Sequence, residues 1–138
     1  LTVSKPRWLR LPMPSSRPTD GEVMIAALPR GGLNAKEASI ARAKASGMVV
    51  VAKGPDTVIA APDGALFLAE AVTSWLSTAG TGDVLAGLVA SRLATGAAPA
   101  AASCDAVWLH AEAARLAGPA FTAGDLARAV PAAMAACL

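Results

Sequence analysis

Short apolar runs in the first half of the chain alternate with polar turns and predict strands. Four of them have strand length: LTVS (1–4), EVMIAAL (22–28), MVVVA (48–52) and TVIAA (57–61). The run at 48–52 has no polar position, which is typical of a strand covered on both faces. After a PDG turn at 62–64, residues 65–69 (ALFLA) and 73–77 (TSWLS) predict edge strands.

A helical pattern lies between the second and the third of these runs. Residues 34–47 begin at Asn34, a favourable N-cap with Glu37 in capping-box spacing, and stop at Gly47. Beyond Gly82 the chain has a helical pattern throughout. Strands that alternate with a helix and are followed by a helical tail predict an α/β layered sheet flanked by helices.

The first helix of the second half is predicted at residues 83–96, DVLAGLVASRLATG, and ends at Gly96. Its apolar stripe consists of Leu85, Leu88, Val89 and Leu93. Gly87 lies inside this helix, where a glycine costs roughly 1 kcal/mol relative to alanine. We therefore expect another element to pack very close to Gly87.

Two more helices complete the pattern. One spans residues 103–118 and is expected to begin at Ser103 as its cap. The other begins at Thr122, which stands in capping-box spacing with Asp125. Pro131 is expected to kink or shorten this last helix, because proline cannot donate a backbone hydrogen bond.

The composition is that of a globular protein without a strong charge bias. Of 138 residues 54% are hydrophobic and 16% are charged, which argues against disorder. The net charge of +2 indicates neither nucleic acid nor a membrane surface as a partner. Basic residues and prolines share residues 5–18, which predicts a solvated extended loop.

Localisation follows from what the sequence lacks. No apolar run is long enough to span a bilayer, and the sequence does not begin with a signal-peptide pattern. Cys104 and Cys137 have no framework spacing, so we expect two free thiols in a reducing cytosol. A cytoplasmic protein is the prediction.

Most familiar catalytic motifs are missing. The sequence has no Cys/His cluster with metal-ligand spacing, no G-x-S-x-G and no phosphate loop that ends in Gly-Lys-Ser/Thr, and GTGDVL lacks the third glycine of the dinucleotide fingerprint. His110 is the one histidine. A ligand or base role is open to it, but a packed, hydrogen-bonded helix residue is the simpler interpretation.

The segment AGTGD, residues 79–83, is the strongest candidate for chemistry. Gly80 and Gly82 let successive N–H groups point into one concavity, and the helix that follows adds its positive dipole end. Together they form an anion site suited to a phosphate. Asp83 in the first turn could accept a proton from an attacking hydroxyl. The alternative is an ordinary glycine turn with a capping aspartate, and this segment alone leaves both open.

A second candidate is AKGPDT, residues 52–57. Lys53 leaves the buried strand, and Gly54 and Pro55 turn the chain into the next one. Lys53 and the N–H groups of the turn could hold the phosphate or ribose of a nucleotide. Taken alone, a surface turn is the better interpretation.

Three segments in this order resemble one family: KGPDTVIAAPDG, TAGTGDVLAGLVAS and AVWLHAEAA. It is the family of ADP/ATP-dependent NAD(P)H-hydrate dehydratases, carbohydrate-kinase-like repair enzymes with the ribokinase-like fold. The resemblance covers about residues 42–118 and implies a ribokinase-like α/β domain. It also implies that residues 1–138 form a single domain, with 1–33 as a remnant of the family's N-terminal part and 34–138 as its nucleotide-binding and catalytic half.

The resemblance implies a reaction and a set of site residues. The family removes water from hydrated NADH or NADPH, with ADP or ATP as phosphoryl donor and Mg²⁺ expected with the nucleotide. Phosphorylation of the ring hydroxyl turns it into a leaving group, which is then eliminated. By this likeness Asp83 meets the hydrated substrate as catalytic base. The adenine nucleotide is contacted by Lys53, Gly54, Pro55, Asp56, Thr57, Gly80, Thr81 and Gly82.

The departures from the family concern the substrate half of the site. The family's GPG turn, Asp-Ala-Asp segment and TPHxGE motif are absent between residues 32 and 34, so we expect an incomplete domain. The chain is then a fragment, or a partner such as a second copy supplies the rest, or the activity is reduced. Two other functions stay open: a small-molecule kinase of the same superfamily, and a non-catalytic module that binds a nucleotide.

Overall fold

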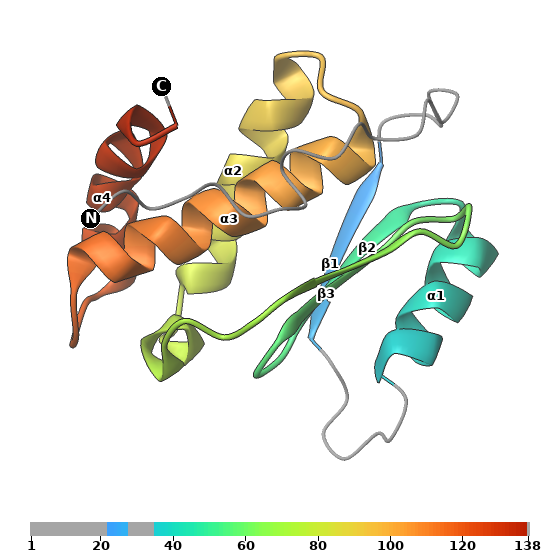
Figure 1. Cartoon of the computed structure of the whole chain (residues 1–138), viewed down its shortest axis with the longest axis horizontal. Coiled ribbons are helices and arrows are strands. Elements are labelled where there is room, and N and C mark those ends of the chain that lie inside the picture. Colours follow the sequence, from blue (N-terminus) through green and yellow to red (C-terminus); the bar gives the residue numbers. More distant parts are fainter. Residues whose placement is uncertain (1–21, 28–34, 138) are drawn as a thin grey trace.

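The described residues, 22–27 and 35–137 of this computed structural model, form one sheet with helices on both of its faces (Figure 1). The strands are β1 (Val23–Ala27), β2 (Val49–Lys53), β3 (Thr57–Ala60) and β4 (Leu66–Ala69). The helices are α1 (Ala35–Ser46), the short 3-10 helix η2 (Ser74–Ser77), α2 (Thr81–Ala94), α3 (Pro99–Ala117) and α4 (Ala123–Ala135).

The sheet has the order β1-β2-β3-β4 and is mixed. β1 and β2 are parallel, with Ile25 opposite Val51, and α1 lies between them in the chain, because parallel neighbours need a crossover connection. β2 and β3 are antiparallel, with Val51 opposite Ile59, and β3 and β4 are antiparallel as well. The carboxyl ends of β1 and β2 therefore point in the same direction.

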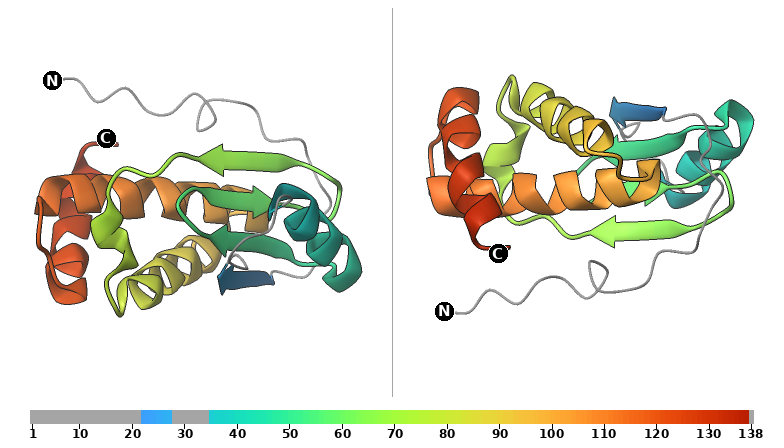
Figure 2. Two further views of the ribbon diagram at one scale, coloured as in Figure 1. Left: turned by 90° about the horizontal axis from the view of Figure 1, so that it is seen from below. Right: turned by 90° about the horizontal axis from the view of Figure 1, so that it is seen from above.

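Both faces of the sheet are covered, as the uninterrupted apolar run at 48–52 predicts. Val49, Val51 and Ile59 belong to the core shared with α2, α3 and α4. Val50 and Val58, which point to the opposite face, pack against α1. Figure 2 shows α1 on one side of the sheet and the helical layer on the other.

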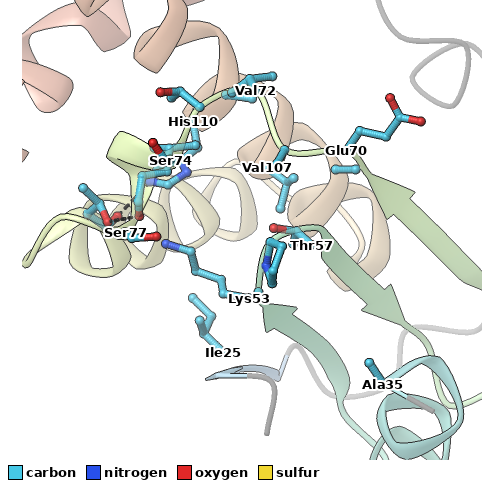
Figure 3. A pocket seen from close by; sticks show the side chains of 18 of the residues that line it. Ile25, Ala35, Lys53, Thr57, Glu70, Val72, Ser74, Ser77, Val107 and His110 are labelled. Atoms are coloured by element: carbon cyan, nitrogen blue, oxygen red, sulfur yellow. Dashed lines mark hydrogen bonds between the residues drawn. The ribbon is translucent and has the colours of Figure 1, made fainter. Parts of the chain in front are cut away.

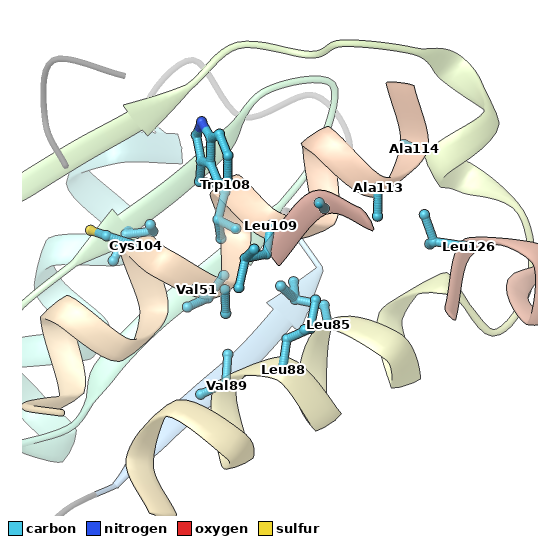
Figure 4. Close-up of a cluster of buried hydrophobic side chains, with 14 of the residues drawn as sticks. Val51, Leu85, Leu88, Val89, Cys104, Trp108, Leu109, Ala113, Ala114 and Leu126 are labelled. Carbon is cyan, nitrogen blue, oxygen red and sulfur yellow. The ribbon is translucent and has the colours of Figure 1, made fainter. Parts of the chain in front are cut away.

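The helical layer is centred on α3, which packs against both α2 and α4. Leu85 of α2, Leu109 and Ala113 of α3 and Leu126 of α4 are buried in one cluster (Figure 4). An ion pair of 2.8 Å between Arg92 and Asp105 joins α2 to α3 near the carboxyl end of α2. The small side chains of the alanine-rich sequence are compatible with such close helix contacts.

Two element predictions are wrong, and both fail for local reasons. Residues 74–77 form a 3-10 helix instead of an edge strand, because Thr73 caps the segment by accepting a hydrogen bond from the Trp75 N–H. α3 begins at Pro99, not at Ser103, since proline is well suited to a first helical position. The Ser103 hydroxyl instead donates to the Pro99 carbonyl at 2.8 Å.

The expected close neighbour of Gly87 is also absent. A Cβ atom built on Gly87 would meet nothing within 4 Å in the described part of the chain. Gly87 is exposed on α2, so this glycine costs helix stability without a packing reason that the structure explains.

The other helix predictions hold in most respects. α4 has the complete capping box of Thr122 and Asp125, and it runs through Pro131 to Ala135 without being shortened there. α2 begins at Thr81, two residues earlier than predicted. Neither cysteine forms a disulfide within the described residues. The strand at 1–4, the loop at 5–18 and the cap Asn34 lie outside the described residues.

No helix in the described part of the chain is both long and apolar enough to cross a bilayer.

Candidate functional site

A cavity of about 1110 Å³ lies where the carboxyl ends of β1 and β2 meet the segment that precedes α2 (Figure 3). The turn between β2 and β3 forms one wall, with Lys53, Gly54, Pro55 and Thr57. The opposite wall comes from η2, Thr81 and α3. In α/β sheets, ligands bind outside the carboxyl ends of the strands, so the cavity occupies the place expected for a binding site.

The lining of the cavity is mostly apolar with several polar side chains. Ile25, Val72, Leu76 and Val107 provide apolar surface. The polar lining residues include Lys53, Thr57, Glu70, Thr73, Ser74, Ser77, Thr81 and His110. In Figure 3, Ser77 and His110 face the same space as Lys53 and Thr57. A mostly apolar wall with a few convergent polar groups is typical of small-molecule sites.

Lys53 is the basic residue of this lining. Its side chain is half-buried, and its ammonium group makes no hydrogen bond or ion pair with the part of the chain that the structure describes. Burial lowers the pKa of Lys53, because a charge is less stable when it is removed from water. A half-buried cation without an anionic partner is suited to bind an anionic ligand.

Of the two glycines at the start of α2, only Gly80 adopts a conformation that favours glycine, because Gly82 is already the second residue of the helix. Gly80 has a φ of +87°, in the left-handed region that favours glycine. The Thr81 N–H donates to the Thr78 carbonyl and the Asp83 N–H to the Gly80 carbonyl. The N–H groups of Gly80 and Gly82, by contrast, donate to no acceptor among residues 22–27 and 35–137. They remain available to an anion at the positive end of α2.

Asp83 lies on the solvent side of the first turn of α2. Successive helical residues are about 100° apart, so Asp83 is about 200° around the helix from Thr81. Thr81 is buried and lines the cavity, whereas Asp83 is exposed and does not. The Asp83 carboxylate has no hydrogen-bond or ion-pair partner in the described chain. The Asp83 carboxylate is therefore open to solvent and lies outside the lining of the cavity.

The predicted site residues are thus brought together only in part. Lys53, Gly54, Pro55, Thr57 and Thr81 line one cavity, while Gly80 and Gly82, the chain neighbours of Thr81, are not among its lining residues. Asp56 has a structural contact instead: its Oδ1 accepts a hydrogen bond of 3.1 Å from the Ala71 N–H. This bond ties the β2–β3 turn to the segment after β4.

His110 is a packed helix residue, as the sequence predicts, and it also contributes to the cavity. Its side chain is buried on α3, and Nε2 lies 2.8 Å from the carbonyl oxygen of Thr81. The pKa of His110 is lowered to about 4, mainly because the ring is buried; the bond to Thr81 acts in the opposite direction, and the nearby Lys53 adds to the lowering. The imidazole is therefore neutral at pH 7.

Sequence reasoning missed the contribution of residues 70–77 to this cavity. Glu70, Ser74 and Ser77 line it, but they belong to no chemical motif and part of their segment resembled a strand. The one available signal was position, since the segment leads directly into the glycine turn.

Fold and cavity together define an α/β domain of the ribokinase-like class, with a polar cavity at the strand ends and a glycine turn that opens a helix. The family model described as NAD(P)H-hydrate dehydratase matches residues 22–134. The chain belongs to this family. The family resemblance and the fold class predicted from the sequence are thereby confirmed.

Relatives with curated names support the same assignment. The ADP-dependent (S)-NAD(P)H-hydrate dehydratase of Neisseria meningitidis serogroup B is 44% identical over 68 residues, which are 49% of this chain and 23% of that protein. The protein of the same name from Xanthomonas campestris pv. campestris is 42% identical over 94 residues, 67% of this chain and 32% of the relative.

A solved structure has the same fold. The ADP/ATP-dependent NAD(P)H-hydrate dehydratase of Bacillus subtilis, co-crystallised with ATP/Mg²⁺, superposes with a TM-score of 0.73 at 28% identity. The superposition covers 82% of this chain and 47% of that chain. The chain thus spans less than half the length of these relatives.

Proposed function

We propose that this chain provides the nucleotide-binding part of an ADP-dependent (S)-NAD(P)H-hydrate dehydratase. The proposal rests on two kinds of donor that have no partner in the described chain. One is the half-buried ammonium group of Lys53, and the other is the pair of N–H groups of Gly80 and Gly82 at the start of α2. Both favour negatively charged oxygens. The dehydratases that the chain resembles are named for ADP, and one was co-crystallised with ATP/Mg²⁺.

In this proposal the adenine nucleotide occupies the cavity and its phosphates reach the glycine turn. Gly54, Pro55, Asp56 and Thr57 approach the nucleotide from the β2–β3 side, and Lys53 neutralises phosphate charge. The N–H groups of Gly80 and Gly82, with Thr81 between them, stabilise charge that develops on the phosphoryl group. Positioning and charge neutralisation are the main contributions in phosphoryl transfer.

Asp83 acts as the base. The 6-hydroxyl of the hydrated nicotinamide ring attacks the terminal phosphorus of ADP, its proton passes to the Asp83 carboxylate, and AMP departs. The ring nitrogen then donates its electron pair, the C–O bond breaks and phosphate leaves. Loss of a proton from the adjacent ring carbon restores the reduced nicotinamide. The exposed position of Asp83 requires the substrate to approach from the side of α2 opposite Thr81.

In this proposal Mg²⁺ comes with the nucleotide, and the described residues hold no cluster of metal ligands of their own. No three His, Cys, Asp or Glu side chains gather there in a way that could hold a metal ion. Mg²⁺ prefers to keep water and phosphate oxygens as ligands, so any Mg²⁺ would accompany the nucleotide.

The test is to incubate the chain with ADP and hydrated NADH, (S)-NADHX, and to measure the absorbance of the reduced nicotinamide that is regenerated. The expected result is ADP-dependent recovery of NADH, with none when ADP is omitted. ADP binding without any recovery, at high protein concentration, would contradict the proposed activity and support a nucleotide-binding module. The module remains a second candidate because the chain spans only 47% of the Bacillus subtilis chain. A phosphorylated product that is not dehydrated would instead indicate a kinase.

A further inference from the structure

His110 and Thr81 form a direct link between the middle of α3 and the first residue of α2. Both side chains are buried, with 4% and 2% of their surfaces exposed, and the Nε2 atom of His110 lies 2.8 Å from the Thr81 carbonyl oxygen. A carbonyl oxygen can only accept a hydrogen bond, so Nε2 must carry a proton, and in the neutral ring Nδ1 is then bare. The contact therefore fixes the tautomer of His110.

Thr81 also makes hydrogen bonds to the segment that precedes it. Its hydroxyl lies 2.7 Å from the Leu76 carbonyl and 2.8 Å from the Thr78 carbonyl, and it can donate to either. Its N–H donates to the Thr78 carbonyl. Thr81 is thus the point at which η2, the turn and α3 are joined by hydrogen bonds.

The link is located where the candidate site needs rigidity. Within the described residues, hydrogen bonds connect α2 and α3 at two places: the bond from His110 to Thr81 at the start of α2, and the Arg92–Asp105 pair near its end. Gly80 and Gly82 flank Thr81, and Asp83 is two residues further on. Because glycines permit many backbone conformations, a turn built on them needs an external contact to keep one geometry.

We propose that His110 is a positioning residue: its Nε2–H holds the Thr81 carbonyl and so fixes the Gly80–Asp83 turn relative to the cavity. The neutral state of His110 at pH 7 is consistent with this role, because the imidazole then donates to Thr81 and keeps no charge in a buried place. The consequence for nucleotide binding rests on the proposed function, whereas the effect on the turn does not.

The first experiment measures the turn without any ligand. His110→Leu removes the donor, and His110→Gln restores an amide N–H at about the place of Nε2. The control is Ser103→Ala, which removes another buried side-chain bond to the backbone of α3, far from the turn. We expect His110→Leu to accelerate amide exchange at Asp83, Val84 and Leu85 about five- to tenfold. His110→Gln should recover most of the protection, and Ser103→Ala should leave these amides unchanged.

Two results of this experiment would overturn the proposal. One is unchanged exchange of the first-turn amides in His110→Leu, and the other is acceleration by the same factor in Ser103→Ala or throughout α3. Nitrogen NMR of the wild-type ring is a second measurement that does not depend on a variant's folding. It should show the neutral Nε2–H form at pH 7, and an Nδ1–H form or a charged ring would contradict the link.

A second experiment connects the turn to the site. If the wild type binds ADP in calorimetry, His110→Leu should weaken that affinity about five- to tenfold and His110→Gln less than about threefold. If His110→Leu accelerates amide exchange in the turn but leaves the ADP affinity unchanged, His110 has no role in nucleotide binding. If the wild type does not bind ADP, the proposed function fails, and amide exchange still decides whether His110 fixes the turn.

Discussion

Gly80 lies so close to α4 that a Cβ atom on it would be 3.0 Å from the Cβ of Ala123. Its φ of +87° is also one that side-chain-bearing residues rarely adopt. The turn before α2 is thus constrained twice, by its own backbone conformation and by the first residue of α4. This relationship explains how a fourth helix, distant in sequence, contributes to the shape of the candidate site.

Replacement of Gly80 by alanine should therefore cost more than the strain of a positive φ. We expect Gly80→Ala to lower the free energy of unfolding by about 2–3 kcal/mol, of which about 1–2 kcal/mol reflects the backbone conformation. Gly96→Ala is the matched control, because Gly96 has a φ of +88° and a Cβ atom on it would meet no described residue within 4 Å. Urea denaturation of both variants measures the difference. Equal losses would mean that the contact with Ala123 has no weight.

Gly82 offers a contrasting test, because the described part of the chain leaves room for a Cβ atom there. A Cβ on Gly82 has no described neighbour within 4 Å, and the same is true of Gly87 on the same helix. Alanine should raise stability at both positions by about 0.5–1 kcal/mol, since it favours helix over the unfolded chain. Only Gly82→Ala should weaken ADP binding, because its methyl group would occupy space next to the Gly82 N–H. Calorimetry and thermal melting measure both effects, and unchanged affinity in Gly82→Ala would count against a phosphate at this turn.

Much of the fold could be predicted from the sequence because its signals are local. The apolar run at 48–52 and the capping box at Thr122 and Asp125 place a buried strand and a helix start correctly. The start of α3 was misplaced because Pro99 stands within an alanine-rich stretch and Ser103 offered a more familiar cap. The prediction that another element packs close to Gly87 was wrong because a glycine within a helix does not by itself require a close neighbour.

The site could be predicted only in part, because side-chain direction depends on helix phase and on distant contacts. The motifs at 53–57 and 79–83 both contribute to one cavity, since Lys53 and Thr81 belong to its lining. No sequence pattern indicates that Thr81 points into the cavity. Because Asp83 lies about 200° around α2 from Thr81, its outward direction could not be predicted either. The bond from His110 to Thr81 joins residues 29 positions apart, and no local pattern indicates it.

Asp83→Asn tests the proposed base. Asp83 is exposed and has no partner in the described chain, so the substitution should change the free energy of unfolding by less than about 0.5 kcal/mol. ADP affinity should stay within about threefold, while recovery of NADH from (S)-NADHX should fall by about 10²-fold or more. A variant that keeps most of its turnover would exclude Asp83 as the base.

The buried imidazole should make stability depend on pH. The pKa of His110 is lowered from 6.5 to about 4 in the folded protein, so the unfolded chain binds the proton first as the pH falls. The contribution of His110 to stability is complete above about pH 6.5 and is lost progressively as the pH falls to about 4. From pH 7 to pH 5 this loss should amount to roughly 1–2 kcal/mol.

Urea denaturation of the wild type and of His110→Gln at both pH values measures this effect. The variant should lose less stability over the same interval, because it has no imidazole to protonate. Asp125, whose pKa is lowered to about 2 by its bonds to Thr122 and Arg128, affects stability only below about pH 4 and does not interfere. An identical pH dependence in both proteins would show that His110 is not the responsible group.

Lys53→Met tests the cation of the cavity. The ammonium group has no partner to lose in the described chain, and burial already disfavours its charge, so the melting temperature should stay the same or rise. ADP affinity should fall about tenfold, whereas the affinity for adenosine should not change, because only the phosphates need a positive charge. Lys36→Met on the exposed face of α1 is the control for the loss of one positive charge. If Lys53→Met weakened the binding of ADP and of adenosine equally, Lys53 would act through the shape of the cavity. The phosphate contact that the proposed function requires would then have to come from the turn before α2 alone.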